Sequence, residues 1–220
     1  MPRPSTVLTL VPLHKIFTGR NGMPGPRSLD NPLALHSTVM RLFGPVHGDS
    51  PRAATGVLFR VEPAAPGKPG ALLIRSAAPP VAEVEGMLSR AEATTPAAGT
   101  PVAFRLSVNA VRRASTRGRD AGTGPRPATY SVPRDDDPNN EGPGMTEWVA
   151  DRLAGAIGGV ELLNHDRNVI GRKTPRVVQT DLVDGFGVVE DPERLTDLLA
   201  AGVGRAKNYG CGLLTVKAIG

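Results

Sequence analysis

The segment GVGRAKNYGCGLLTVKAIG, residues 202–220, combines a loop containing four glycines and two cations with a final apolar run. A glycine directly after an apolar-periodic segment is typical of a helix C-terminus, and the apolar run at 211–219 predicts a strand. The usual dinucleotide and P-loop sites have the opposite order, strand then helix. Since one glycine suffices to end a helix, two interpretations remain. The loop is an ordinary connection, or its backbone and the cations Arg205 and Lys207 approach a sugar-phosphate chain.

Upstream of this loop, strands and helices alternate. Asp191 can cap a helix and Pro192 suits its first position, so a helix is predicted to start here and to end at Gly202. The run RVVQTDLVDGFGVVE (176–190) is extended and breaks at Asp184-Gly185, which indicates either one long bent strand or a hairpin. The segment 146–159 has one apolar side and predicts a helix, and 128–133 predicts a strand.

The N-terminal half shows the same order more clearly. Strands are predicted at 5–13, 56–63, 71–77 and 101–114, a helix begins after Asn31 with Pro32 at its first position, and a second helix is predicted at 81–92. This β-α-β-β-α-β order is ferredoxin-like. We therefore predict an α+β protein of two tandem ferredoxin-like domains, residues 1–114 and 128–220, joined by a linker at 115–127 that is rich in structure breakers.

Charge, cysteine content and the lengths of the apolar runs restrict the classes of protein that fit this sequence. The 26 Lys and Arg residues against 21 Asp and Glu give a net charge of +5, which favours a polyanionic partner. Because Cys211 is the single cysteine, an intrachain disulfide and a multi-cysteine zinc site are excluded. The sequence has neither a signal-peptide pattern nor an apolar run of membrane-spanning length, so we expect a cytoplasmic protein without a membrane partner.

Charged residues are unevenly distributed. Residues 105–134 hold seven arginines and one acid, Asp120, and form either a solvated linker or a surface that faces RNA phosphates. The acidic turn RDDDPNNEG (134–142) has carboxylates but no neighbouring histidine, so we expect no metal site there or elsewhere.

Four segments together resemble a known family. They are NPLALHSTVMRLF (31–43), FRLSVNAVRR (104–113), VVQTDLVDG (177–185) and GVGRAKNYGCGLLTV (202–216), in this order. They resemble the CasE endoribonucleases of type I-E CRISPR systems, within the superfamily of repeat-associated RNA-binding proteins. The resemblance implies two ferredoxin-like domains and metal-independent cleavage of a CRISPR repeat stem-loop RNA at the 3′ base of its stem. It also implies a role in antiviral defence, in which the product stays bound within a multisubunit surveillance complex.

The resemblance also implies roles for particular residues. His36 takes the place of the family's catalytic histidine, whereas Leu33 stands where many members have a tyrosine and cannot transfer a proton. A basic loop residue often assists, and here Lys173 is favoured, with Arg172 second and Arg176 also available. The residues expected to contact RNA are Arg27, Arg105, Arg112, Arg113, Arg176, Gly204, Arg205, Lys207, Gly210 and Gly212.

The chemistry is consistent with these residue types. RNA cleavage needs a group that takes the 2′-OH proton, a group that protonates the leaving 5′-oxygen, and positive charge near the phosphate. A histidine can serve in either protonation state near neutral pH. By residue type alone His14, His47 and His165 equal His36. We predict a metal-independent endoribonuclease; the alternatives are a non-catalytic RNA-binding subunit of the same superfamily and a basic ribosome-type binding module.

Overall fold

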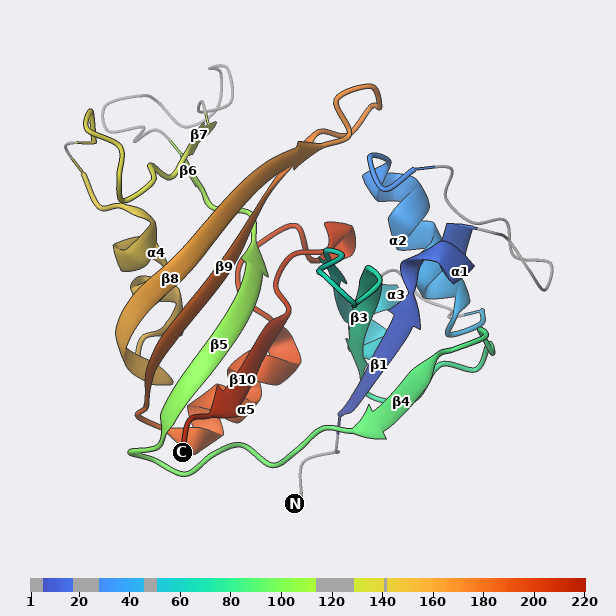
Figure 1. Ribbon diagram of the computed structural model, residues 1–220, viewed down its shortest axis with the longest axis horizontal. Helices are drawn as coiled ribbons and strands as arrows, with labels where there is room; N and C mark the ends of the chain where they lie inside the picture. The colour runs from blue at the N-terminus through green and yellow to red at the C-terminus, as the bar shows by residue number, and fades with distance from the viewer. Residues whose placement is uncertain (1–5, 18–27, 46–50, 114–128, 141) are drawn as a thin grey trace, which may run out of the picture.

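The computed structural model describes residues 6–17, 28–45, 51–113, 129–140 and 142–220. These residues form two four-stranded antiparallel sheets and a small two-stranded ribbon (Figure 1). The first sheet has the order β2-β3-β1-β4 and the second the order β10-β5-β9-β8, so that the first and third strands of each unit pair at its centre. The strands of the first sheet are β1 (Val7–Pro12), β2 (Leu58–Glu62), β3 (Ala71–Ser76) and β4 (Leu88–Ala91). Those of the second are β5 (Pro101–Val108), β8 (Ile157–Ile170), β9 (Val178–Val189) and β10 (Leu214–Ala218).

Helix α2 (Pro32–Arg41) forms where the sequence predicts it and positions much of the site described below. The Asn31 side chain accepts a hydrogen bond from the Ala34 N–H at 3.0 Å, and Pro32 occupies the first turn. Leu35 and Val39 are buried against the first sheet, in a core that includes Phe59 and Ile74 of β2 and β3. Local capping and apolar spacing therefore fix both the start of this helix and its buried face.

The predicted helix at 81–92 is wrong. This segment contains β4, which pairs with β1 in the register Val7↔Ala91. Gly86 has a φ of +77°, a left-handed conformation that does not fit a helix interior, and the Val81 side chain is 73% exposed. The apolar spacing of these residues therefore does not reflect a buried helical face.

The predicted strand at 101–114 exists as β5 but belongs to the second sheet, between β10 and β9. Its inward side chains Val102, Phe104 and Leu106 share one core with α4 (Met145–Leu153) and α5 (Pro192–Ala201). Strand pairing therefore changes from the first sheet to the second between β4 and β5. The expected linker at 115–127 lies outside the described residues.

Three further elements of the second unit differ from expectation. Helix α4 ends at Leu153, before Gly155 with a φ of +75°, and the long strand β8 follows where helix was expected to continue. The strand expected at 128–133 is β7 (Thr129–Ser131), which pairs only with β6 (Val111–Arg113) in the two-stranded ribbon. The Asp135 carboxylate of the acidic turn accepts a hydrogen bond from the Thr146 N–H at 3.0 Å and so stabilises the start of helix α4.

The remaining expectations near the C-terminus are confirmed. Residues 178–189 form one strand, β9, that runs through Asp184-Gly185. Helix α5 begins after Asp191, whose carboxylate accepts hydrogen bonds from the N–H groups of Glu193 and Arg194. Gly202 ends it with a φ of +75°, and a Cβ there would lie 2.7 Å from Leu58 of the first sheet. The order β5-α4-β8-β9-α5-β10 is β-α-β-β-α-β, whereas the described residues of the first unit have β4 in place of the second helix.

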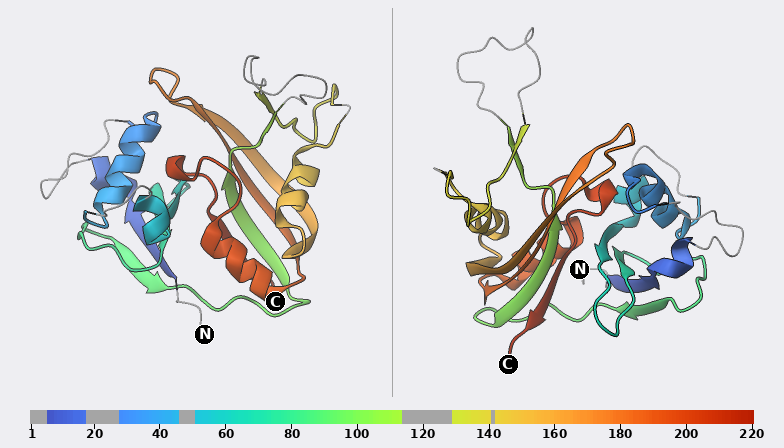
Figure 2. Two further views of the ribbon diagram at one scale, coloured as in Figure 1. Left: turned by 180° about the vertical axis from the view of Figure 1, so that it is seen from behind. Right: turned by 45° about the horizontal axis from the view of Figure 1, so that its top comes forward.

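Buried arginines join the two units. Arg60 of β2 donates to the carbonyl oxygens of Arg105 (2.8 Å) and Leu213 (3.0 Å) in the second unit. Arg75 of β3 is fully buried, pairs with Glu92, and donates to the Leu199 carbonyl of α5 at 2.9 Å. These contacts hold the first unit, with α2, against the loop that follows α5 (Figures 1 and 2).

Candidate active site

His36 lies midway along α2 and lines a cavity of about 420 Å³ together with Met40 and Pro51. Its Nδ1 atom is buried and has no hydrogen-bond partner among the described residues. Burial, and then the positive charge of Arg52, lower the pKa of His36 below its ordinary value of 6.5. An imidazolium would need partners for two N–H groups, so both the geometry and the electrostatics favour a neutral ring.

One cation, Arg52, acts electrostatically on His36, and a second, Lys207, lies near Arg52. Arg52 belongs to the short helix α3 (Pro51–Thr55) and donates to the Val57 carbonyl at 3.0 Å. Lys207 belongs to the 3₁₀ turn η2 (Lys207–Tyr209) and donates to the Ala201 carbonyl at 2.6 Å. The pKa of Lys207 is lowered by burial and then by Arg52. Arg52 thus acts electrostatically on both His36 and Lys207. These three residues belong to α2, α3 and the glycine-rich loop, so these three segments lie close together in the fold.

The glycine-rich loop reaches from α5 to α2, and η2 packs against α2 (Figure 1). Its ends are joined by a hydrogen bond from the Val203 N–H to the Gly212 carbonyl at 2.9 Å. Gly210 and Gly212 are buried and have φ values of +87° and +90°. A Cβ at Gly210 would lie 3.3 Å from the Phe59 ring, and one at Gly212 would lie 3.0 Å from Lys207. These two glycines therefore shape the loop, and of the three glycines expected to contact RNA only Gly204 is exposed.

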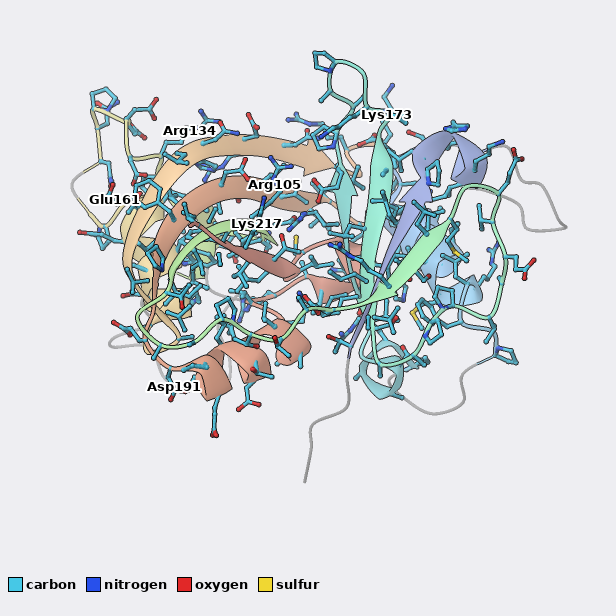
Figure 3. All side chains as sticks on the ribbon, turned by 60° about the horizontal axis from the view of Figure 1, so that its bottom comes forward. Arg105, Arg134, Glu161, Lys173, Asp191 and Lys217 are labelled. Carbon is cyan, nitrogen blue, oxygen red and sulfur yellow. The ribbon has the colours of Figure 1, made fainter. Side chains whose placement is uncertain are left out.

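The tip of the β8–β9 hairpin also lies near the start of α2. The Gly171 N–H donates to the Asp30 carboxylate at 2.8 Å, just before the cap of α2. The Arg176 guanidinium lies over the Tyr209 ring of η2, 5.6 Å from its centroid. Arg172 and Lys173 are exposed at this tip, where Figure 3 labels Lys173. The hairpin therefore presents two cations beside the helix that carries His36.

The other predicted residues are dispersed. Arg105 donates to Asp184 (2.6 and 2.9 Å) and to Glu62 (2.9 Å), so its charge is neutralised by two acids, and this argues against an RNA contact. Arg112 and Arg205 line a separate pocket on the second unit. Arg27 lies outside the described residues, and of Arg113 only the backbone, in β6, is described.

The remaining histidines are less suited to catalysis. His165 pairs with the buried carboxylate of Asp181 at 2.8 Å, which also accepts from Arg167 at 2.6 Å. Burial alone would raise the pKa of Asp181, but the hydrogen bonds from His165, Gln179 and Arg167 outweigh it and lower that pKa. His14 is exposed on α1 (Leu13–Phe17), and His47 lies outside the described residues.

Arg52 and Tyr209 were not predicted as site residues. Arg52 lies in the segment PRAAT, which carries no recognisable motif, and Tyr209 approaches Arg176 only through the folded hairpin. Leu33 lies one turn before His36 and is 42% exposed. Within the described ranges, no group of three or more His, Cys, Asp or Glu side chains is arranged to hold a metal ion. Nor does that part of the chain contain a helix long and apolar enough to span a membrane.

The family model and the similar solved structures are all of CRISPR-associated proteins. The family model described as CRISPR associated protein matches residues 12–218. The fold is similar to that of the CRISPR-associated protein Cas6e from Escherichia coli K-12, with 19% identity, a TM-score of 0.66, and 97% of this chain and 100% of that chain covered. It is also similar to the CRISPR endoribonuclease Cse3 bound to a 19-nucleotide RNA, with 24% identity, a TM-score of 0.65 and coverage of 97% and 99%.

A third similar structure is a chain of a CRISPR RNA-guided surveillance complex in a pre-nicking state, with 22% identity, a TM-score of 0.65 and coverage of 98% and 100%. No curated protein matches the sequence. These similarities confirm the predicted fold, two tandem ferredoxin-like domains.

Proposed function

The chain belongs to the family of CRISPR-associated proteins, and we propose that it is a metal-independent endoribonuclease that cleaves CRISPR repeat stem-loop RNA. The observation that carries the proposal is His36, which lies beside the cation Arg52, has a lowered pKa, and has a buried Nδ1 without a hydrogen-bond partner among the described residues. Its position on the first long helix is also the one expected from the sequence. The similarity in fold to an endoribonuclease bound to RNA supports the substrate class.

The proposed reaction uses the substrate's own 2′-OH as the nucleophile. His36 is neutral before reaction; in the tautomer with its proton on Nδ1 it accepts the 2′-OH proton at Nε2 while the 2′-oxygen bonds to the adjacent phosphorus. The bond from phosphorus to the 5′-oxygen breaks, and that oxygen takes a proton from water or from Lys207. The products are a 2′,3′-cyclic phosphate and a 5′-OH. Covalent structure holds the nucleophile next to the phosphate, so no activated water is needed.

Positive charges stabilise the phosphate as negative charge develops on it. We assign this role to Arg52 and Lys207, because Arg52 acts on both His36 and Lys207 in the folded protein. Lys173, with Arg172 beside it, contributes from the hairpin tip once RNA lies across α2. In this assignment Arg176 positions Tyr209 by stacking on its ring.

We also propose that the cleaved RNA stays bound and that the protein joins a type I-E surveillance complex in the cytoplasm. The similarity to a chain of a CRISPR RNA-guided surveillance complex supports this proposal. The second candidate function is a non-catalytic RNA-binding subunit, which the exposed Leu33 in place of a proton-transferring side chain favours.

His36→Ala separates the two functions. Single-turnover cleavage of the CRISPR repeat RNA should fall about 100-fold or more, because the base is lost. Filter binding should change little, since the phosphate contacts lie elsewhere. His14→Ala, on an exposed face of α1, is the matched control and should cleave normally. Wild-type protein that binds the repeat but does not cut it would identify the non-catalytic subunit, and normal cleavage by His36→Ala would reject the assignment of the base.

A further inference from the structure

The glycine-rich loop of the second unit is packed on β2, the edge strand of the first sheet. A Cβ at Gly202, where the loop starts, would lie 2.7 Å from the Leu58 side chain. A Cβ at Gly210, near its end, would lie 3.3 Å from the Phe59 ring. Because neighbouring side chains of a strand point to opposite faces, the loop contacts both faces of β2. It lies between the two sheets (Figures 1 and 2).

Arg60, the next residue of β2, holds the chain just after the loop ends. Its Nη1 atom donates to the carbonyl oxygens of Leu213 (3.0 Å) and Arg105 (2.8 Å). Its Nη2 atom donates to the Thr215 hydroxyl at 3.1 Å, and its Nε and Nη2 atoms both donate to the Glu62 carboxylate. All five N–H groups of the guanidinium therefore have acceptors, and its side chain is only 3% exposed. The orientation of this group is thus fixed on every side.

The Lys207 side chain folds back onto the part of the loop that Arg60 holds. Its Nζ atom donates to the Ala201 carbonyl at 2.6 Å, just before the loop starts. A Cβ at Gly212 would lie 3.0 Å from the Lys207 Cγ atom. Leu213, the acceptor for Arg60, is the next residue along the chain. The position of the Lys207 ammonium therefore depends on where residue 213 is held.

The start of the same strand positions the other cation of the candidate active site. Arg52 donates from Nη1 to the carbonyl of Val57, which directly precedes β2, at 3.0 Å. The stretch 57–60 thus contacts both Arg52 and the loop that carries Lys207. The two cations are therefore placed relative to one short piece of the first unit.

We propose that Arg60 is a positioning residue for the cleavage reaction and that it acts through Lys207. By holding the Leu213 carbonyl it fixes the base of the loop, and so places the Lys207 ammonium where charge develops on the phosphate. Glu62 keeps the Arg60 guanidinium in this orientation. A displacement of about 1 Å can cost about 100-fold in rate, so a buried residue without contact to RNA can control the reaction. The proposal rests on the proposed function for the reaction itself.

Single-turnover kinetics of Arg60→Met test this role. At saturating protein, cleavage of the repeat RNA should slow about 10–100-fold, while the protein concentration at half-maximal rate stays near the wild-type value. In a Lys207→Met background, Arg60→Met should slow the reaction no further, because its effect passes through Lys207. The matched control is Val102→Ala, which removes buried volume at the end of β5 remote from the loop. It should lower the free energy of unfolding and leave the rate near that of the wild type.

A second variant covers the case in which Arg60→Met does not fold. Arg60→Lys keeps a cation beside Glu62, but a lysine lacks the planar fork that reaches this carboxylate and two carbonyl groups at once. Cleavage at saturating protein should therefore slow in Arg60→Lys, by less than in Arg60→Met. A wild-type rate in Arg60→Lys would overturn the proposal.

Amide hydrogen exchange follows the loop without any cleavage. The Val203 N–H donates to the Gly212 carbonyl at 2.9 Å, and the Gly212 N–H donates to the Ser107 carbonyl at 2.6 Å. If Arg60 holds the base of the loop, Arg60→Met should speed exchange of these two amides more than that of the β9 amides. Val102→Ala should show no such preference for the loop.

The outcomes separate this proposal from the proposed function. Equal losses of rate in Arg60→Met and Val102→Ala, or a further loss in the Lys207→Met background, would show that Arg60 acts on stability alone and would overturn the proposal. A wild-type rate in Lys207→Met would also overturn it. If the wild-type protein does not cleave repeat RNA, the proposed function fails and exchange decides about Arg60. Faster loop exchange in Arg60→Met then supports its hold on the loop, and unchanged exchange overturns it.

Discussion

At the scale of single residues, the surroundings of His36 decide which form of its ring is present. Burial and Arg52 both disfavour the imidazolium, and the buried Nδ1 has no acceptor among the described residues. A neutral imidazole at neutral pH can accept the 2′-OH proton directly. The same electrostatics lower the pKa of Lys207, which then holds its proton less tightly. Burial, and then one cation on a short helix, thus lower the pKa of both groups.

The pH dependence of cleavage follows from this. Because the pKa of His36 in the free protein lies below 6.5, kcat/KM should fall on the acid side with a midpoint below 6.5. Arg52→Gln removes a positive neighbour, so the midpoint should move to higher pH while the plateau rate falls. The measurement is cleavage at subsaturating protein between about pH 5 and 8. An acid limb that does not move in Arg52→Gln would show that Arg52 does not act on the catalytic group.

At the scale of elements, local signals and tertiary pairing account for what the sequence could and could not predict. Helices α2 and α5 were predicted because Asn31-Pro32 and Asp191-Pro192 carry their own caps. The partner of β5, and the strands β4 and β8, depend on pairing between distant segments, which a local pattern does not encode. The residues of the candidate active site divide in the same way, into those predicted from the sequence and those that only folding brings together. His36 was found by family resemblance, whereas Arg52 and Tyr209 join it only through folding.

The glycine-rich loop gives a prediction at this scale. Gly210→Ala should lower the free energy of unfolding by more than about 1–2 kcal/mol, the cost of a left-handed alanine, because its Cβ also presses on Phe59. Gly67→Ala is the matched control, since Gly67 has a φ of +72° and nothing within 4 Å of the added Cβ. Urea unfolding measures both. Equal losses in the two variants would show that the loop does not pack tightly on Phe59.

At the scale of the whole molecule, the site exists because two units are held together by buried polar contacts. Arg60 and Arg75 reach from the first sheet to carbonyl groups of the second unit. Their side chains are 3% and 1% exposed, so the guanidinium groups depend on these partners for satisfaction. The relative placement of α2 and η2, on which the proposed chemistry depends, follows from this junction.

Arg75→Met should therefore destabilise the protein by about 3–5 kcal/mol, because Glu92 is left in a partly buried position without its cation. Arg75→Met/Glu92→Met should recover part of the loss, since no unpaired charge remains. Arg90→Met, at an exposed site on β4 in the same sheet, should be close to neutral. Thermal and urea unfolding provide the comparison. A loss below about 1 kcal/mol in Arg75→Met would contradict the role of this ion pair.

The central claim is that this protein cleaves RNA through the substrate's 2′-OH, and one measurement tests it most directly. Repeat RNA and the same RNA with a single 2′-deoxyribose just upstream of the cleaved phosphate are incubated with the protein in excess EDTA. The account predicts that the all-RNA substrate is cut to a 2′,3′-cyclic phosphate and a 5′-OH. The deoxy substrate should bind with nearly the same affinity and remain intact, because the nucleophile is missing. Cleavage of the deoxy substrate at an undiminished rate would contradict the mechanism.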